Sequence, residues 1–274
     1  MSEDMNETLG GAQVSVPRSI LDRFRLDGRT ALVTGAGQGI GRAFAHALAE
    51  AGAKVAVIDL SADRADEVAR ELREKGAEAI SVQADAADET SVSSFVRTTV
   101  QTFGRLDIAV NNAGINLNSA AEEATLEEWD MVHNLNLRGV FIACQHEAKV
   151  MFPQGYGKII NTASMASMIV PHPQKQVSYN VSKGAVVSLT RTLAAEWADR
   201  GIRVNCISPG IIRTALIEES EALAPLVDEW VSNIPAGRLG EVDDLQGAVV
   251  YLASEVSDYM TGHNLAIEGG QTLW

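Results

Sequence analysis

Short apolar runs and longer amphipathic segments alternate along the chain from about residue 26 onward. The apolar, β-branched runs predict buried strands at 30–34, 54–59, 77–82, 106–111, 157–164 and 202–210. Helical spacing of apolar positions predicts helices between them, at 39–52, 62–75 and 88–103. Nearly continuous apolar strands that alternate with helices are typical of a parallel sheet covered on both faces. We therefore expect an α/β fold, a single-domain doubly wound parallel sheet with right-handed crossovers.

The first 25 residues lack this alternation. They are rich in Ser, Gly and charged residues, so we expect residues 1–25 to form an N-terminal extension or arm and residues 26–274 to form the folded domain. The opening is acidic and lacks a long apolar run, which argues against a secretion signal. No apolar run approaches membrane-spanning length. A cytoplasmic protein is expected.

Composition narrows the possible partners. The chain has 274 residues, 36 acidic and 22 basic side chains, and a formal net charge of −14. This charge repels nucleic-acid phosphates and anionic lipid, so neither nucleic acid nor a membrane is an expected partner. Cys144 and Cys206 lie in apolar segments and are expected to be buried, reduced thiols. The five histidines have no ligand spacing beside a carboxylate, so no metal is expected.

A glycine-rich segment, GAGQGIG at 35–41, follows the first predicted strand. Glycines allow positive φ and let a pyrophosphate approach backbone N–H groups at the start of a helix. The spacing is G-x-x-x-G-x-G, because Ile40 stands where the common G-x-G-x-x-G fingerprint has its third glycine. Taken alone, the motif also fits a strand-to-helix turn without a ligand.

Asp59 ends the second predicted strand. A carboxylate at this point can accept hydrogen bonds from both ribose hydroxyls of an adenosine, whereas a 2′-phosphate would face a like charge. The alternative is a helix N-cap, a role that suits Ser61 better. Asp59 therefore favours NAD over NADP.

Tyr179 and Lys183 are four residues apart and share one face of a predicted helix. A free tyrosine has a pKa of about 10 and is a poor base at neutral pH unless a cation stabilises its phenolate. Lys183 could supply that cation. The Y-x-x-x-K spacing alone also occurs by chance between two exposed helical residues.

Together these motifs resemble the short-chain dehydrogenase/reductase family, from about Leu26 to the C-terminus. The matching residues, in chain order, are Thr34, Gly35, Gly39 and Gly41 of T-G-x-x-x-G-x-G, Asp85, Asn111, Asn112, Ala113 and Gly114 of N-N-A-G, Asn136, Ser164, Tyr179, Lys183, and Pro209, Gly210 and Thr214 of P-G-x-x-x-T. The resemblance implies a Rossmann-like fold and hydride transfer between a nicotinamide cofactor and a carbinol or carbonyl carbon.

The resemblance also implies the roles of individual residues. Tyr179 would be the acid/base, Lys183 would lower its pKa and bind the cofactor ribose, and Ser164 would hydrogen-bond the reacting oxygen. Asn136 would hold a water that links Lys183 to solvent, with helix packing or a kink as the alternative. The residues expected to bind NAD are Gly35, Gln38, Gly39, Ile40, Gly41, Asp59, Asp85, Ala86, Asn112, Ala113, Gly114, Tyr179, Lys183, Pro209, Gly210, Ile212 and Thr214.

The substrate is indicated by the loop between Ser164 and Tyr179, which is slightly longer than is usual in the family. This insertion, the LAAEWA segment at 193–198 and the GGxTxW ending resemble polyol dehydrogenases such as galactitol dehydrogenase. His172 and Gln174 in the loop could join Ser164 in contacting a hydroxyl-rich substrate. A surface insertion without substrate contact is the alternative. The resemblance implies an NAD-dependent enzyme that interconverts a secondary alcohol of a neutral polyol with its ketone.

Two other functions stay open: a 3-oxoacyl-carrier-protein or other carbonyl reductase that uses NADPH, and a non-catalytic nucleotide-sensing protein. Asp59 and the net charge disfavour the first, and the retained Ser164, Tyr179 and Lys183 disfavour the second. An acidic lid segment is expected at about 215–236. The resemblance suggests a homotetramer, with a homodimer as the alternative, and Trp274 is expected to pack on the core or on a neighbouring subunit.

Overall fold

The computed structural model describes residues 19–214, 217 and 223–273. Its centre is a seven-stranded sheet in the order β3-β2-β1-β4-β5-β6-β7, and every neighbouring pair is parallel. The strands are β1 Thr30–Thr34, β2 Lys54–Asp59, β3 Ala79–Gln83, β4 Ile108–Asn111, β5 Gly157–Thr162, β6 Ile202–Pro209 and β7 Asn264–Ile267. This is the Rossmann-like, doubly wound arrangement that the alternating pattern predicts.

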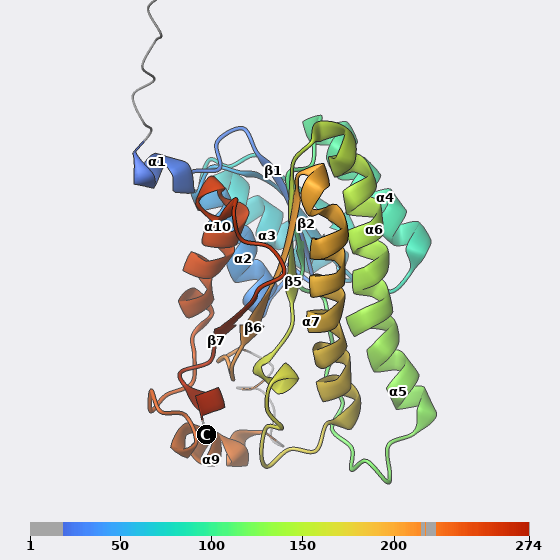
Figure 1. Cartoon of the computed structure of the whole chain (residues 1–274), viewed down its shortest axis with the longest axis vertical. Coiled ribbons are helices and arrows are strands. Elements are labelled where there is room, and N and C mark those ends of the chain that lie inside the picture. The colour runs from blue at the N-terminus through green and yellow to red at the C-terminus, as the bar shows by residue number, and fades with distance from the viewer. Residues whose placement is uncertain (1–18, 215–216, 218–222, 274) are drawn as a thin grey trace, which may run out of the picture.

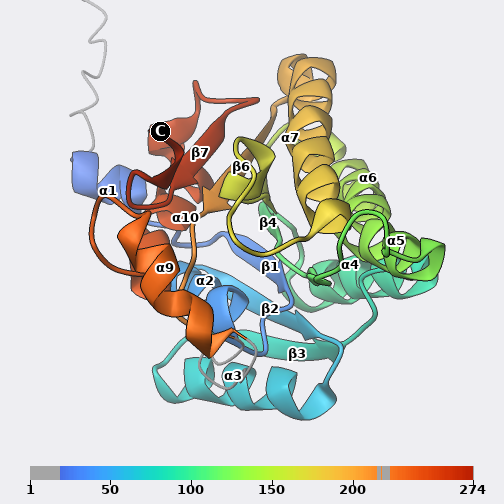
Figure 2. The same cartoon turned by 90° about the horizontal axis from the view of Figure 1, so that it is seen from below.

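Helices cover both faces of the sheet (Figures 1 and 2). On one face lie α2 Gly39–Glu50, α3 Ala62–Glu74 and α10 Gln246–Ala253, and on the other lie α4 Glu89–Phe103, α6 Val140–Met151 and α7 Val177–Trp197. The shorter helices are α1 Ile20–Phe24, α5 Leu126–His133 and α9 Val227–Ser232. Two apolar cores result, one on each side of the sheet, which explains why β1 is buried along its whole length.

Polar side chains cap several helices where the sequence predicts a helix start. Ser61 Oγ accepts a hydrogen bond from Arg64 N and so caps α3, as expected for this residue. Asp88 caps α4 by accepting from Ser91 N at 2.7 Å, and α4 ends at Gly104, whose φ of +84° is a left-handed conformation. These ends fix where each crossover leaves the sheet.

Some boundaries differ from the sequence-based expectation. Strand β5 ends at Thr162, so Ser164 lies beyond the strand, at the start of a 3₁₀ turn at Met165–Ser167. Residues Ile20–Phe24 of the predicted arm form helix α1, with no buried side chain. Residues 1–18, Trp274 and about a third of the predicted lid (215–216 and 218–222) lie outside the described residues.

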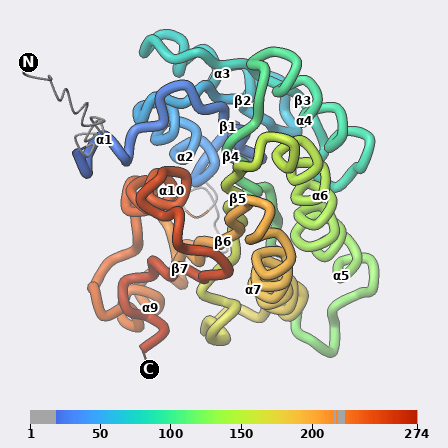
Figure 3. Tube along the Cα trace, turned by 45° about the horizontal axis from the view of Figure 1, so that its top comes forward, coloured from blue at the N-terminus to red at the C-terminus, as the bar shows by residue number. Residues whose placement is uncertain are grey.

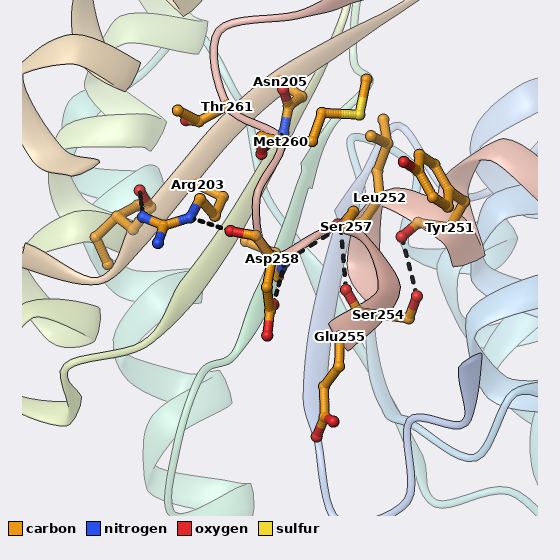
Figure 4. A network of polar contacts seen from close by, with 12 residues as sticks. Arg203, Asn205, Tyr251, Leu252, Ser254, Glu255, Ser257, Asp258, Met260 and Thr261 are labelled. Atoms are coloured by element: carbon orange, nitrogen blue, oxygen red, sulfur yellow. Dashed lines mark hydrogen bonds and ion pairs between the residues drawn. The ribbon is translucent and has the colours of Figure 1, made fainter. Parts of the chain in front are cut away.

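A polar network ties the amino-terminal ends of β5 and β6 to the segment that precedes β7 (Figure 4). Arg203 Nε donates to the Asp258 carbonyl at 2.6 Å, and Asn205 Nδ2 donates to the Met260 carbonyl at 3.0 Å. The buried Lys158 ammonium lies 2.7 Å from Asp258 Oδ1. This network holds the edge strand β7 in place at the end of the sheet opposite the carboxyl ends of the strands.

After β7 the chain returns beside α9 (Figure 3), where Ala236 N donates to the Gly269 carbonyl at 3.0 Å.

The Cys144 and Cys206 thiols are free and buried, as predicted.

Candidate active site

One cavity of about 530 Å³ lies at the carboxyl ends of the strands, the usual ligand position in such sheets. Every residue that the sequence assigns to the cofactor lines it, and so do Ser164 and Gln174. Asn136 and His172 are not part of its lining. The fold thus brings into one cavity segments that are spread along the chain from the glycine-rich turn to Thr214.

The glycine-rich turn forms a tight cradle at the start of α2. A Cβ atom on Gly41 would lie 2.1 Å from the Gly35 carbonyl oxygen and 2.6 Å from Asn112 Nδ2, so no larger residue fits there. Gly39 has a φ of +54° and opens the helix. Gln38, the residue before it, makes no side-chain capping bond. The first-turn N–H groups of α2 and the space above them fit a pyrophosphate.

Asp59 is 5% exposed, and both of its carboxylate oxygens already accept hydrogen bonds. Gly37 N donates to Oδ2 and Ser61 N donates to Oδ1, each at 2.9 Å. Each oxygen keeps a further lone pair, so the carboxylate can still accept from ribose hydroxyls. The backbone contacts hold the Asp59 carboxylate at the end of β2.

Sequence reasoning missed Arg64, which lies beside Asp59 and lines the same cavity. Arg64 Nη2 is 3.5 Å from Asp59 Oδ1, and Arg64 Nη1 donates to Gln38 Oε1 at 2.8 Å. Its position in the first turn of α3, shortly after Asp59, is a signal that could have revealed it. The Asp59 carboxylate is expected to disfavour a 2′-phosphate, and Arg64 places a positive charge beside it.

Ser164, just beyond β5, meets Tyr179 and Lys183 of α7 in the cavity. Ser164 Oγ accepts from Ala166 N at 3.1 Å, which orients the hydroxyl at the end of β5. Lys183 Nζ donates to the Thr162 carbonyl at 2.7 Å and lies 5.6 Å from the centre of the Tyr179 ring. The three groups therefore occupy one buried corner.

The pKa shifts of Tyr179 and Lys183 differ from the expectation that the lysine lowers the tyrosine pKa. Burial raises the pKa of Tyr179, and a hydrogen bond with Ser164 opposes this increase. Burial lowers the pKa of Lys183 to about 8. The predicted lowering of the tyrosine pKa by Lys183 is not seen in this structure, because loss of solvation dominates and the lysine Nζ is hydrogen-bonded to Thr162.

Asn136 lies in a π-helical segment, Asn134–Gly139, between α5 and α6. Its Nδ2 donates to the Ile115 carbonyl at 2.8 Å and to Ser182 Oγ at 3.2 Å, and its Oδ1 accepts from Ile115 N at 2.9 Å. Both amide hydrogens are therefore used within the protein. These contacts fit the packing alternative, in which Asn136 fixes the chain after Gly114 against α7.

His172 and Gln174 behave differently although both lie in the inserted loop. The His172 side chain is 77% exposed, and its Nδ1 lies 2.8 Å from Glu229 Oε1, outside the cavity. Gln174 lines the cavity, and its Oε1 accepts from Trp230 Nε1 at 2.9 Å. Of the two, only Gln174 can reach a molecule in the cavity as the structure stands.

Further cavity residues were not identified from the sequence: Asn116, Asn118, Gln176 and Trp230. Asn116 and Asn118 closely follow the N-N-A-G segment after β4, so their place at the carboxyl end of a strand was a usable signal. Trp230 gave no such signal, because it is 56 residues beyond Gln174 and meets it only through the fold.

Among the described residues, no group of three or more His, Cys, Asp or Glu side chains could hold a metal ion. No helix in the described part of the chain is long and apolar enough to cross a membrane.

Several known proteins are similar to this chain over almost its whole length. The D-threitol dehydrogenase of Mycolicibacterium smegmatis is 41% identical over 91% of this chain and 95% of its own length. The galactitol 2-dehydrogenase (L-tagatose-forming) of Cereibacter sphaeroides is 39% identical over 92% and 98%. A 2-dehydro-3-deoxy-D-gluconate 5-dehydrogenase of Dickeya dadantii is 40% identical over 92% and 98%, and a 3-oxoacyl-acyl-carrier-protein reductase of Synechocystis is 38% identical over 91% and 99%.

Solved structures agree with this relationship. A short-chain type dehydrogenase/reductase from Mycobacterium marinum superposes with a TM-score of 0.89 at 43% identity, over 93% of this chain and 99% of that chain. A gluconate 5-dehydrogenase from Burkholderia cenocepacia in complex with NADP and tartrate has a TM-score of 0.86 at 38% identity, over 93% and 99%. The family model described as enoyl-(acyl carrier protein) reductase matches residues 35–272. The chain belongs to the short-chain dehydrogenase/reductase family.

Proposed function

We propose that this oxidoreductase is NAD-dependent and interconverts a secondary alcohol of a neutral polyol with its ketone. The observation that carries the proposal is the chemistry of the substrate end of the cavity. Four carboxamides line it: Asn116, Asn118, Gln174 and Gln176. Among the described lining residues, the only cations are Lys183 in the catalytic corner and Arg64 beside Asp59. Carboxamides pair with hydroxyls, whereas a carboxylate substrate would lack a cationic partner at this end.

The proposed chemistry uses Tyr179 for the proton and Ser164 for the reacting oxygen. The nicotinamide cofactor, when bound, accepts or supplies the hydride. In oxidation the Tyr179 phenolate takes the hydroxyl proton, and in reduction the phenol returns it. Ser164 donates a hydrogen bond to the reacting oxygen and fixes its distance from Tyr179. Burial disfavours the Tyr179 phenolate, the hydrogen bond with Ser164 opposes this effect, and Lys183 is the proposed contact of the cofactor ribose.

NAD is the proposed cofactor because the buried Asp59 carboxylate lies where a 2′-phosphate would approach. Arg64 acts in the opposite direction, since a guanidinium is a good partner for phosphate. The Arg64 guanidinium already uses some of its N–H donors in its contacts with Asp59 and Gln38. We therefore expect a preference for NAD that is moderate in size.

The second candidate function is that of a 3-oxoacyl-acyl-carrier-protein reductase, which is the activity of one of the relatives. Its similarity over nearly the whole chain is the observation in its favour. A net charge of −14 disfavours docking of an acidic carrier. A purely nucleotide-sensing role is disfavoured because Ser164, Tyr179 and Lys183 all line one cavity.

We also propose self-association into a tetramer. Large apolar side chains are exposed on α5, α6 and α7, which lie side by side in Figure 1: Met131, Phe141 and Val181. A depression at this face is lined by Leu137, Phe141 and Leu189 together with the polar residues Asp130, His133, Asn134 and Arg138. Exposed large apolar side chains bordered by polar residues are typical of an interface between subunits.

The direct test follows nicotinamide absorbance with NAD(H) or NADP(H) across three substrate sets. These are neutral C4 to C6 polyols, sugar acids of the same carbon number, and acetoacetyl thioesters. We expect NAD-linked oxidation of polyols, with kcat/KM at least about tenfold above that of the matched acid because the acid lacks a cationic partner. Preferential NADPH-linked reduction of the thioester would replace this proposal with the carrier-protein reductase.

A further inference from the structure

Besides the His172–Glu229 pair, a second contact links the inserted loop to the acidic segment that follows β6. Trp230 on α9 donates its indole N–H to Gln174 Oε1 at 2.9 Å, and both side chains line the cavity. Trp230 is only 3% exposed and packs with Ile234 and Leu239. A buried indole N–H requires an acceptor, and Gln174 is that acceptor.

This contact fixes which end of the Gln174 carboxamide faces the Trp230 indole. An indole nitrogen can only donate a hydrogen bond, so the amide must turn its oxygen toward Trp230. The Nε2 group is then directed away from the indole with two N–H donors. The described part of the chain provides no partner for these donors. Because Gln174 lines the cavity, these two donors are available to a molecule bound there.

The neighbouring carboxamides lack such a constraint. Asn116 Nδ2 donates to Gln176 Oε1 at 2.7 Å, and Gln176 Nε2 donates to Asn180 Oδ1 at 2.8 Å. Each partner in this chain is itself a carboxamide, so reversing all of the amides together preserves every link. Gln174 differs because its partner cannot accept. Its polarity is set by the protein before any substrate binds.

We propose that Trp230 is a positioning residue that makes Gln174 a specificity-determining donor for an acceptor oxygen of the substrate. This inference rests on the proposed function, since a polyol carries hydroxyl oxygens on carbons beyond the one that reacts. A hydroxyl oxygen accepts from Gln174 Nε2, whereas a methylene or an ammonium group at that position cannot. Pre-orientation avoids the entropy cost of ordering the amide on binding.

The test compares the best polyol with analogues that each lack one hydroxyl beyond the reacting carbon. In the unmodified enzyme, one analogue should have a KM about threefold to tenfold higher than the polyol, because one hydrogen bond is lost. In Gln174→Leu the polyol KM should rise by a similar factor, and the difference between polyol and that analogue should disappear. The kcat for the polyol should stay within about threefold.

Trp230→Phe keeps an aromatic ring but removes the N–H. It should raise the polyol KM in the same direction, and the double variant with Gln174→Leu should be no worse than Gln174→Leu alone. Gln174→Glu still accepts from Trp230 but presents a carboxylate oxygen to the cavity. A substrate hydroxyl can turn to donate to that carboxylate, so Gln174→Glu should bind the polyol better than Gln174→Leu does. Trp129→Phe, on α5 outside the cavity, is the matched control for loss of an indole N–H.

Three results would overturn the proposal: an unchanged polyol KM in Gln174→Leu, equal effects on the polyol and all analogues, or additive effects of the two substitutions. If Trp230→Phe does not fold, the two Gln174 variants decide the question. If the unmodified enzyme oxidises no polyol, the proposed function fails separately. The same variants are then measured with its best carbonyl substrate, where an unchanged KM in Gln174→Leu again overturns the role of Gln174.

Discussion

At Tyr179 and Lys183, spacing along the helix and burial have opposite effects on the charged forms of the side chains. Spacing brings a phenol and an ammonium together, whereas burial disfavours the charge on each. Their separation by four positions on α7 places them together, as the sequence predicts. Burial then favours the neutral form of both, because it raises the pKa of Tyr179 and lowers that of Lys183 to about 8. Spacing could identify the pair, but the direction of the pKa shifts required the packed structure.

The first residue-scale prediction concerns proton transfer. Tyr179→Phe keeps the ring and removes the phenolic oxygen, so turnover should fall by about 10²-fold to 10⁴-fold. Cofactor affinity should stay within about threefold, because the other lining residues are unchanged. Absorbance kinetics measure the first quantity and fluorescence titration the second. Tyr259→Phe, at a fully exposed tyrosine, is the control. Near-parental turnover in Tyr179→Phe would contradict the acid/base assignment.

The second residue-scale prediction concerns cofactor choice. Asp59→Ala removes an acceptor and a negative charge together, so the ratio of kcat/KM for NAD to that for NADP should fall by about tenfold or more. Arg64→Ala should raise this ratio, because it removes the only cation beside Asp59 among the described lining residues. Asp63→Ala, an exposed first-turn carboxylate of α3, is the control. Unchanged ratios would place cofactor choice elsewhere in the cavity.

At the scale of elements, a buried polar network joins α6 to β4 and β5. Asn111 Nδ2 donates to Glu147 Oε2 and to Asn161 Oδ1, each at 3.1 Å, and Asn161 Nδ2 donates to Thr190 Oγ1 at 3.0 Å. Asn111, the first residue of the N-N-A-G segment, therefore serves packing between elements, while the next three residues line the cavity. Burial raises the pKa of Glu147 to about 8.

A raised folded-state pKa means that protonated Glu147 stabilises the fold. Its contribution is complete below the ordinary pKa of about 4.5 and is lost as the pH rises toward 8. Glu147→Gln mimics the protonated form, so at pH 8 it should exceed the parent in free energy of unfolding by on the order of 2 kcal/mol.

Urea midpoints from pH 4.5 to pH 8.5 measure this effect as the difference between variant and parent. The advantage of Glu147→Gln should grow with pH and be smallest at the acidic end. Glu123→Gln, at an exposed glutamate, should show no such trend. A difference that does not vary with pH would indicate that Glu147 does not titrate in this range.

At the scale of the whole molecule, the exposed apolar side chains of α5, α6 and α7 set the proposed assembly. Light scattering should give a mass near four times the chain mass of 29.2 kDa. Phe141, which is 43% exposed, lies within this face. Phe141→Glu should reduce the mass to that of a dimer or monomer, because a carboxylate would be buried at the interface. Leu21→Glu, on exposed α1, should leave the mass unchanged. A parental mass in Phe141→Glu would place the interface on another face.

The sequence by itself determined the alternation of strands and helices, the glycine-rich turn and the order of the family motifs. These features depend on local periodicity and on residues close together in the chain, such as Tyr179 and Lys183. Most predicted strands therefore fall within a few residues of their observed positions, and Ser61 caps α3 as predicted.

Only the tertiary structure decided which distant side chains share an environment. The crossovers and the strand order bring Arg64 beside Asp59, bury Glu147 beside Asn111 and place Trp230 against Gln174. Periodicity reports whether a position is buried, but it does not report what lies against it. Hydrogen-bond polarity and pKa depend on that partner, so the charge of Asp59's neighbour and the direction of the Gln174 amide could emerge only from the fold.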